Sequence, residues 1–216
     1  MSGEPKTSRR ATQALQTRQE ILAAARGLFA TNGYSGTSVA QVAAAAGVSV
    51  QTIYDRLGSK RALVLALNDL IDEEGDIRAL ASAIPTSTDP IELLRIAATI
   101  SRNINERCGD IVAALFSAAA VETEMREVRD ESRRRHRAGI AGLTRRLASL
   151  EALRGDLDAE TAADVIAAMT DPQVARTFVG EYGWTWDRWQ EWTEAALIRL
   201  VLEAERTADP QAGGDY

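Results

Sequence analysis

Apolar residues recur along most of the chain at intervals of three and four, which is the period of an amphipathic helix. The first apolar stripe consists of Ile21, Leu22, Ala25, Leu28 and Phe29. It predicts a helix that begins near Thr17 and ends in the segment "TNGYSGT", where Asn32, Gly33 and Gly36 break the pattern. The preceding residues are polar and show no apolar period, so we expect a mobile basic tail there.

A second, short helix follows the glycine-rich break. Its apolar positions are Val39, Val42, Ala43 and Ala46. Thr37 or Ser38 can cap its free N–H groups, and Gly47 suits the left-handed position after its end. Only Val48 separates Gly47 from the next start signal, which predicts a tight turn.

Ser49 is that start signal, and it predicts a third helix. Val48 before the cap and Ile53 in the helix can form a hydrophobic staple that sets the entry angle. On a helical wheel Ile53 and Leu57 share the inner face, whereas Gln51 and Asp55 point outward. The outer face is flanked by Thr52, Tyr54 and Arg56.

Two short helices joined by a glycine turn form the arrangement that places a recognition helix in the major groove of DNA. Gly58 ends the third helix, and Ser59 starts a fourth that we expect to be long. The N-terminus of this fourth helix carries Lys60 and Arg61 and is suited to bind a backbone phosphate.

Beyond residue 75 the pattern remains helical, which predicts an all-α fold. We expect helices over about 90–107, 110–119, 121–150, 158–169 and 186–205, with a short one capped by Asp171 and Pro172. The expected organisation is a flexible basic tail (1–16), a helix-turn-helix domain (17–75), a helical ligand-binding and dimerisation domain (76–207) and a flexible tail (208–216).

Charge is distributed unevenly along the 216 residues. The net charge is −6, but residues 1–62 hold eight basic and three acidic residues, a net +5 that leaves −11 for the remainder. A basic end on an acidic body is typical of a nucleic-acid-binding head. The single cysteine and the lack of a signal segment or long apolar run predict a soluble cytoplasmic protein without a membrane partner.

Residues suited to catalysis are scarce. The only histidine, His136, and the only cysteine, Cys108, lie on different predicted helices. They provide no metal site, no nucleophile with an adjacent base and no glycine loop for a phosphate. We therefore expect no enzyme activity, no metal and no cofactor.

The segment "RQEILAAARGLFATNGYSGTSVAQVAAAAGVSVQTIYDRLGSKRALVLAL" resembles the DNA-binding domain of the TetR family of bacterial regulators over roughly residues 17–67. The resemblance implies an all-helical homodimer whose C-terminal domain holds an inducer pocket and the dimer interface. It also implies phosphate contacts by Thr37 or Ser38 and by Tyr54, and base contacts by Val50, Gln51 and Thr52. The DNA-facing set is Thr37, Ser38, Ser49, Val50, Gln51, Thr52, Tyr54, Arg56 and Lys60.

The chain departs from the family pattern after Tyr54, where Asp55, Arg56 and Leu57 replace the usual aromatic or histidine pair and phenylalanine. Arg56 favours phosphate binding. Asp55 is either a solvated helix residue or an acceptor for a cytosine amino group. Gln51 is the stronger candidate for base reading, because an amide can bind adenine N6 and N7 together, a contact worth about 1–3 kcal/mol of discrimination.

Two further groups are expected in the C-terminal domain. A mainly apolar cavity with polar points Ser101 and His136 and walls Phe116 and Phe178 would suit a hydrophobic or aromatic inducer. The alternative is that Ser101 and His136 are separately satisfied core residues. The expected dimer interface comprises Ile166, Trp192, Ala196 and Leu200. The run "SRRRHR" is interpreted as a solvated face rather than a second nucleic-acid site.

These expectations combine into a dimeric DNA-binding regulator that a small ligand releases from a palindromic operator. Repression is the expected sense, while activation and ligand-independent silencing stay open. A helical adaptor or architectural protein is the alternative, and it would leave no sequence-specific footprint on DNA.

Overall fold

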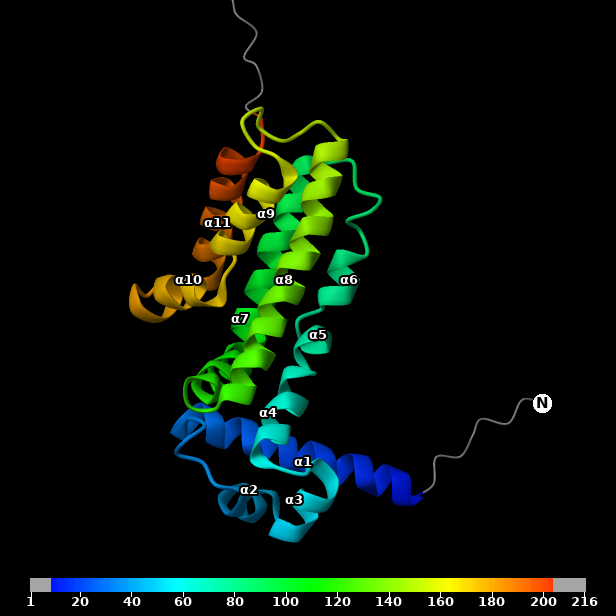
Figure 1. Ribbon diagram of the computed structural model, residues 1–216, viewed down its shortest axis with the longest axis vertical. Coiled ribbons are helices and arrows are strands. Elements are labelled where there is room, and N and C mark those ends of the chain that lie inside the picture. Colours follow the sequence, from blue (N-terminus) through cyan, green and yellow to red (C-terminus); the bar gives the residue numbers. More distant parts are fainter. Residues whose placement is uncertain (1–8, 204–216) are drawn as a thin grey trace, which may run out of the picture. The chain divides into compact units, whose positions relative to one another are not determined.

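The computed structural model describes residues 9–203, and every element named within them is a helix, which confirms the all-α fold (Figure 1). The chain divides into two compact units. The head unit comprises the described residues up to Gly75 together with Ile104–Arg133, and the body unit comprises Asp76–Asn103 and the described residues from Arg134 onward. Within the described residues no helix is long and apolar enough to cross a bilayer.

The head unit is built from helices α1 to α5 and from parts of α7 and α8. Their bounds are α1 Arg9–Asn32, α2 Val39–Ala46, α3 Val50–Leu57, α4 Lys60–Asn68, α5 Ile71–Glu74, α7 Pro90–Val121 and α8 Thr123–Ser149. Helix α2 packs against α1 and α3, and α4 packs against α1 (Figure 1). Helices α7 and α8 each continue from one unit into the other.

Helix α1 begins at Arg9 instead of near Thr17, so residues 9–16 of the expected tail are helical. Ala11, Gln13 and Leu15 are good helix formers, and a helix already nucleated by its buried part extends at little cost. Leu15 remains 60% exposed, which explains why an apolar period did not reveal this extension. The first eight residues and the expected tail 208–216 lie outside the described residues.

The fourth helix is short rather than long. Helix α4 ends at Asn68 and is followed by α5 and by α6, Ile77–Ala81. The side chains of Asn68 and Asp69 compete with the backbone for hydrogen bonds and so weaken a helix. Asp76 then adopts a left-handed conformation with φ 55°, which stops helical continuation from Gly75.

Helix α7 is continuous, although a break was expected between residues 107 and 110. Gly109 costs about 1 kcal/mol inside a helix, a penalty that the buried neighbours Cys108 and Ile111 outweigh. Asp110 does not cap a new helix, because its carboxylate accepts hydrogen bonds from Arg26 of α1.

One hydrophobic core in the head unit combines segments far apart in sequence. Ile21 and Phe29 of α1 and Ile53 of α3 share it with residues of α7 and α8. The α7 and α8 members are Cys108, Ile111, Ala114, Leu115, Ala118, Ala119 and Met125. The junction of α7 and α8 therefore belongs with the head unit rather than with the rest of segment 76–207.

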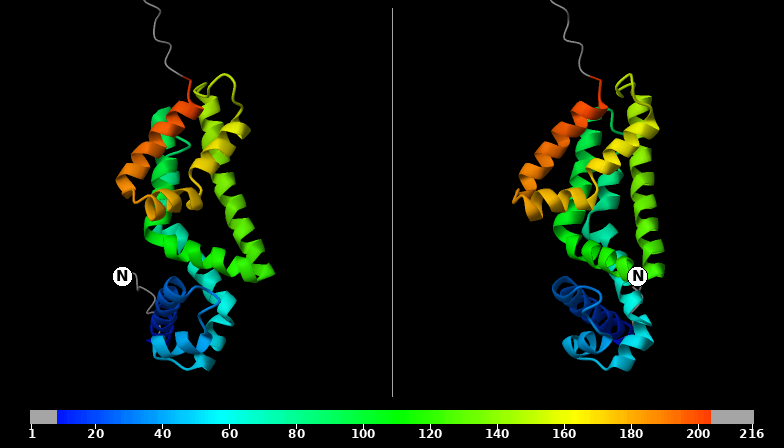
Figure 2. Two further views of the ribbon diagram at one scale, coloured as in Figure 1. Left: turned by 90° about the vertical axis from the view of Figure 1, so that its left-hand side faces the viewer. Right: turned by 60° about the vertical axis from the view of Figure 1, so that its left-hand side comes forward.

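The body unit adds α6, α9 (Ala159–Met169), α10 (Pro172–Arg176), the π-helix η1 (Thr177–Glu181) and α11 (Trp186–Val201). Helices α9 and α11 lie side by side in both views of Figure 2. The core of the body unit joins α7, α8, α9 and α11. Its buried residues are Leu93, Leu94, Ala97, Ile140, Leu143, Leu147, Ala162, Ala163, Ile166, Leu197 and Val201.

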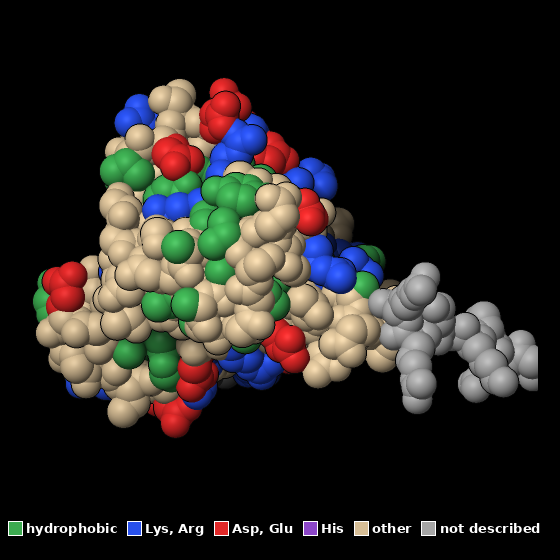
Figure 3. Space-filling view, turned by 90° about the horizontal axis from the view of Figure 1, so that it is seen from below, with side chains coloured by type: hydrophobic (Ala, Val, Ile, Leu, Met, Phe, Trp, Pro, Cys, Tyr) green, Lys and Arg blue, Asp and Glu red, His purple; other side chains and the backbone are tan. Residues whose placement is uncertain are grey.

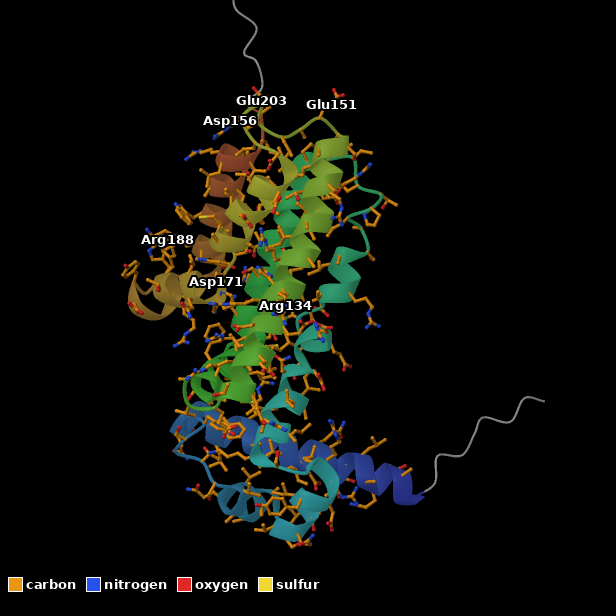
Figure 4. All side chains as sticks on the ribbon, in the orientation of Figure 1. Arg134, Glu151, Asp156, Asp171, Arg188 and Glu203 are labelled. Carbon is orange, nitrogen blue, oxygen red and sulfur yellow. The ribbon has the colours of Figure 1, made fainter. Side chains whose placement is uncertain are left out.

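The loop between α8 and α9 is hydrogen-bonded to the end of α11. Leu153 and Leu202 form an isolated antiparallel bridge, and the Gly155 N–H donates to the Glu203 carboxylate at 2.8 Å. Arg154 pairs with Asp156, and Figure 4 shows Asp156 and Glu203 at the same end of the body unit. These contacts close the four-helix core at that end.

Candidate nucleic-acid interface

Helix α2 is capped at both ends, which sets the position of the turn into α3. The Ser38 hydroxyl accepts from the Gln41 N–H, and the Gln41 side chain accepts from the Ser38 N–H at 2.7 Å. Gly47 then has a φ of 67°, which residues with a side chain rarely adopt. Its N–H donates hydrogen bonds to carbonyls of α2. The chain is therefore turned sharply before α3 begins.

Ser49 caps α3. Its hydroxyl accepts from the Thr52 N–H at 3.0 Å and lies 2.8 Å from the Thr52 hydroxyl. Ile53 is fully buried, and Val48 packs against the same core. The opposite face carries Gln51 and Asp55 and is open to solvent. Val50 and Tyr54, which flank the buried face, are 39% and 47% exposed. The side of α3 that faces away from the core is therefore accessible to a partner.

The outward face of α3 also carries an internal hydrogen bond that was not foreseen. The Gln51 amide nitrogen donates to an Asp55 carboxylate oxygen at 2.7 Å. Both side chains are exposed. The bond joins side chains one helical turn apart. It pairs Gln51, which is expected to read bases, with Asp55, for which the sequence left two roles open.

Thr37 and Ser38 were alternatives for a phosphate contact, and the structure distinguishes them. Thr37 is 2% exposed, and its hydroxyl bonds with the carbonyls of Leu28 at 3.1 Å and Gly33 at 2.9 Å. It holds the turn between α1 and α2 and does not reach the surface. Ser38 is exposed, so of the two side chains only that of Ser38 lies at the surface.

Lys60 begins α4, but its ammonium group is engaged within the head unit. It lies 4.0 Å from the centroid of the Tyr34 ring, an arrangement that stabilises a cation. Burial lowers its pKa, and the Glu122 charge opposes that shift. The Tyr34 hydroxyl in turn donates to Glu122 at 2.6 Å.

Acidic residues of α5, α7 and α8 form ion pairs with several of the basic residues of the head unit. Arg26 binds Asp110 and Glu74, and Arg61 pairs with Glu124. Arg56 keeps its charge exposed on α3 and donates to the Ala14 carbonyl at 3.4 Å. The view in Figure 3, from the side of α2 and α3, shows uncharged side chains with scattered charges of both signs. The basic character read from residues 1–62 is thus partly neutralised by later segments.

The expected ligand residues lie in both units. In the body unit Ser101 is 2% exposed and donates to the Thr170 carbonyl at 2.8 Å, and the Thr170 hydroxyl lies 3.3 Å from His136 Nε2. Burial lowers the pKa of His136. Thr170, which sequence reasoning missed, therefore brings Ser101 and His136 together. Phe116 belongs to the head unit, where the Arg133 guanidinium lies 5.3 Å from its ring centroid.

Phe178, the fourth expected ligand residue, stands in an aromatic cluster of the body unit. Its ring centroid is 4.7 Å from that of Trp184, 5.0 Å from that of Trp192 and 5.8 Å from that of Tyr182. Tyr182 is 63% exposed. The cluster joins η1 to α11 and leaves aromatic surface open to solvent.

The expected dimer residues separate into a buried one and a surface group. Ile166 is fully buried in the body core, so its side chain contacts its own chain. Trp192 and Leu200 are 39% and 40% exposed and Ala196 is half-buried. These three residues are spaced by four on α11 and form one face of that helix. Among the described residues no group of three or more His, Cys, Asp or Glu side chains could hold a metal ion.

Comparison with known proteins extends the sequence resemblance. A family model described as bacterial regulatory proteins of the tetR family matches residues 21–67. The HTH-type transcriptional regulator TtgR of Pseudomonas putida is 31% identical over 170 residues, which cover 76% of this chain and 81% of that protein.

Solved structures with the same fold include two regulators. NalD, the secondary repressor of the MexAB-OprM multidrug efflux pump in Pseudomonas aeruginosa, aligns with a TM-score of 0.72 at 20% identity, over 88% of this chain and 98% of its own. A regulator from Saccharomonospora viridis in complex with choline aligns with a TM-score of 0.72 at 20% identity, over 88% of this chain and all of its own.

Proposed function

The chain belongs to the TetR family of bacterial transcriptional regulators, and we propose that it acts as a homodimeric repressor that reads a palindromic operator. The observation that carries the proposal is the outward face of α3. Val50, Gln51 and Tyr54 project from a helix whose inner face is anchored by buried Ile53. A rigid short helix with exposed hydrogen-bonding and apolar groups is suited to the major groove.

Few side chains among the described residues are positioned to bind the DNA backbone. The exposed candidates are Tyr54 and Arg56 on α3 and Ser38 at the start of α2. Because phosphate contacts supply much of the affinity, we expect moderate binding by one head unit and a need for two half-sites. In a dimer, two recognition helices read half-sites about one DNA turn, 34–36 Å, apart.

The α11 face formed by Trp192, Ala196 and Leu200 is the proposed dimer surface. Aromatic residues such as the exposed Trp192 are enriched in protein interfaces, and Ala196 and Leu200 extend an apolar face from it along α11. Ile166 supports this surface from within the core rather than by direct contact. Trp192→Glu should shift the protein toward monomer in light-scattering chromatography. The charge reversal Glu191→Lys, at an exposed position on the side of α11 away from these residues, should not.

Release by a small hydrophobic or aromatic ligand is the proposed control. Buried Ser101 and Thr170 and half-buried His136 provide a polar group beside the apolar core of the body unit. Their mutual bonds also fit the alternative of a satisfied core. A solved regulator of the same fold holds choline, which supports a small-molecule site without identifying this chain's ligand.

Selection from a random duplex library tests the DNA-binding proposal. A regulator of this kind should enrich two inverted half-sites, and the purified protein should protect that sequence in a footprint. An adaptor without sequence reading would enrich no motif. A thermal-shift screen of hydrophobic and aromatic compounds, followed by a DNA-release assay, tests the ligand: a stabilising compound that leaves the complex intact would contradict release.

A further inference from the structure

The hydrogen bond between Gln51 and Asp55 determines which way the Gln51 amide faces. The amide nitrogen lies 2.7 Å from the carboxylate oxygen, on the solvent-exposed side of α3. A carboxylate accepts hydrogen bonds and has no proton to donate. Only the NH₂ end of the amide can therefore face Asp55, because the reversed amide would place two acceptor oxygens against each other.

This orientation limits what Gln51 can offer to a base. Of the two amide N–H groups, one is held by Asp55, so one N–H donor and the carbonyl acceptor remain. Adenine presents an acceptor, N7, beside a donor, the N6 amino group. Guanine presents two acceptors, N7 and O6, and a glutamine with one free donor cannot satisfy both.

We propose that Asp55 is a positioning residue for base recognition: it holds the Gln51 amide in the orientation that accepts adenine and rejects guanine. The inference rests on the proposed function, since it needs α3 to enter the major groove. It assigns a role to the position at which the chain departs from the family pattern.

The same carboxylate has a cost that provides a second observable. A negative charge on the DNA-facing side of α3 is repelled by the phosphate backbone, so it weakens binding to every sequence. Asp55 thus reduces general affinity while it sharpens discrimination. Removal of the carboxylate should change these two properties in opposite directions, which a merely structural residue would not do.

The test compares the full-length wild type with Asp55→Ala, Asp55→Asn, Gln51→Ala and the double variant Gln51→Ala/Asp55→Ala. Each protein is used to select from a random duplex library and is then titrated with the selected site carrying adenine or guanine at the contacted position. Asp55→Asn is the matched control for size, because its amide can bond with either end of Gln51. Both side chains are exposed, so these variants should keep the wild-type circular dichroism and unfolding temperature.

We expect the wild type to prefer adenine at one position of each half-site. Asp55→Ala and Asp55→Asn should reduce the adenine-over-guanine ratio about tenfold and bind non-specific DNA more tightly. In the adenine-over-guanine ratio the double variant should match Gln51→Ala, because Asp55 acts on discrimination through Gln51. Its binding to non-specific DNA should still be tighter than that of Gln51→Ala, because the carboxylate is removed.

Three results would overturn the inference. An unchanged adenine-over-guanine ratio in Asp55→Ala would remove the positioning role. A cytosine preference that persists in Gln51→Ala and disappears in the double variant would show that Asp55 reads a base directly. A wild type that enriches no motif would remove the proposed function, and the inference with it, whereas the first two results would leave that function standing.

Discussion

The bond between Tyr34 and Glu122 gives a measurable test of how the head unit is held together. Tyr34→Phe removes one hydroxyl and keeps the ring, so Lys60 retains its aromatic partner. The lost hydrogen bond is 2.6 Å long and reaches a carboxylate. Hydrogen bonds to charged groups contribute about 1.5–3 kcal/mol. Glu122 is only half-buried, so we expect a loss near the lower end, about 1.5 kcal/mol, in the free energy of unfolding.

The assay is a double-mutant cycle of Tyr34→Phe and Glu122→Ala, measured by urea and thermal unfolding. For a chain of this size each kcal/mol corresponds to roughly 2–4 °C in Tm. If the hydrogen bond is the main interaction between Tyr34 and Glu122, the coupling energy between these two residues should be about 1 kcal/mol. Additive effects of the two substitutions, within about 0.3 kcal/mol, would refute the reasoning.

The alkaline range provides an independent check on the same tyrosine. Burial, followed by the hydrogen bond to Glu122, raises the pKa of the Tyr34 phenol above its ordinary value of 10.0. The folded state therefore keeps a proton that the unfolded state releases, so this contribution is present below pH 10 and is lost as the pH rises further. Above pH 10 the free energy of unfolding should therefore decrease less steeply with pH in Tyr34→Phe than in the wild type.

Three further predictions concern other buried or paired groups. Arg26→Ala should lower the free energy of unfolding by about 2 kcal/mol, because Glu74 and Asp110 would face each other without their shared cation; an effect below about 0.5 kcal/mol in urea unfolding would contradict this. Burial lowers the pKa of His136, so its contribution is present above about pH 6.5 and is lost as the pH falls; His136→Gln should reduce the decrease in Tm between pH 7 and pH 5, and an identical decrease would count against it. Burial, with the nearby Glu74 charge, raises the pKa of the Cys108 thiol to about 12, so a thiol reagent should react slowly with the native protein at pH 8 and rapidly in denaturant; rapid native labelling would disprove the burial argument.

Local signals in the sequence determined most of the helix-turn-helix. Ser38, Gly47 and Ser49 act within one or two turns of chain, and the structure shows each as the cap that its position predicts. The apolar period likewise placed Ile53 in the core. Such features are predictable because their hydrogen bonds and φ angles depend on neighbours a few residues away.

Continuity of the longer helices was decided by tertiary packing. Gly109 and Asp110 have the local character of a break, but α7 passes through them because its flanks are buried and Arg26 binds Asp110. In α4 the opposite holds, and the helix ends at Asn68 where a longer one was expected. Propensity is a weak influence that buried contacts override in α7, whereas the local residues Asn68 and Asp69 are the ones that weaken α4 at its end.

The assignment of polar side chains to roles also needed the fold. Thr37 and Lys60 were expected at the DNA surface, whereas carbonyls of Leu28 and Gly33 and the ring of Tyr34 engage them within the head unit. Residue type and spacing along one helix determined that α3 has an outward polar face. Which neighbouring side chains stay available was decided by the packing of the head unit. The end of α1 and the turn after it engage Thr37 and Lys60, and α7 and α8, distant in sequence, supply carboxylates to Arg26 and Arg61. Such contacts depend on which segments the fold brings together in space.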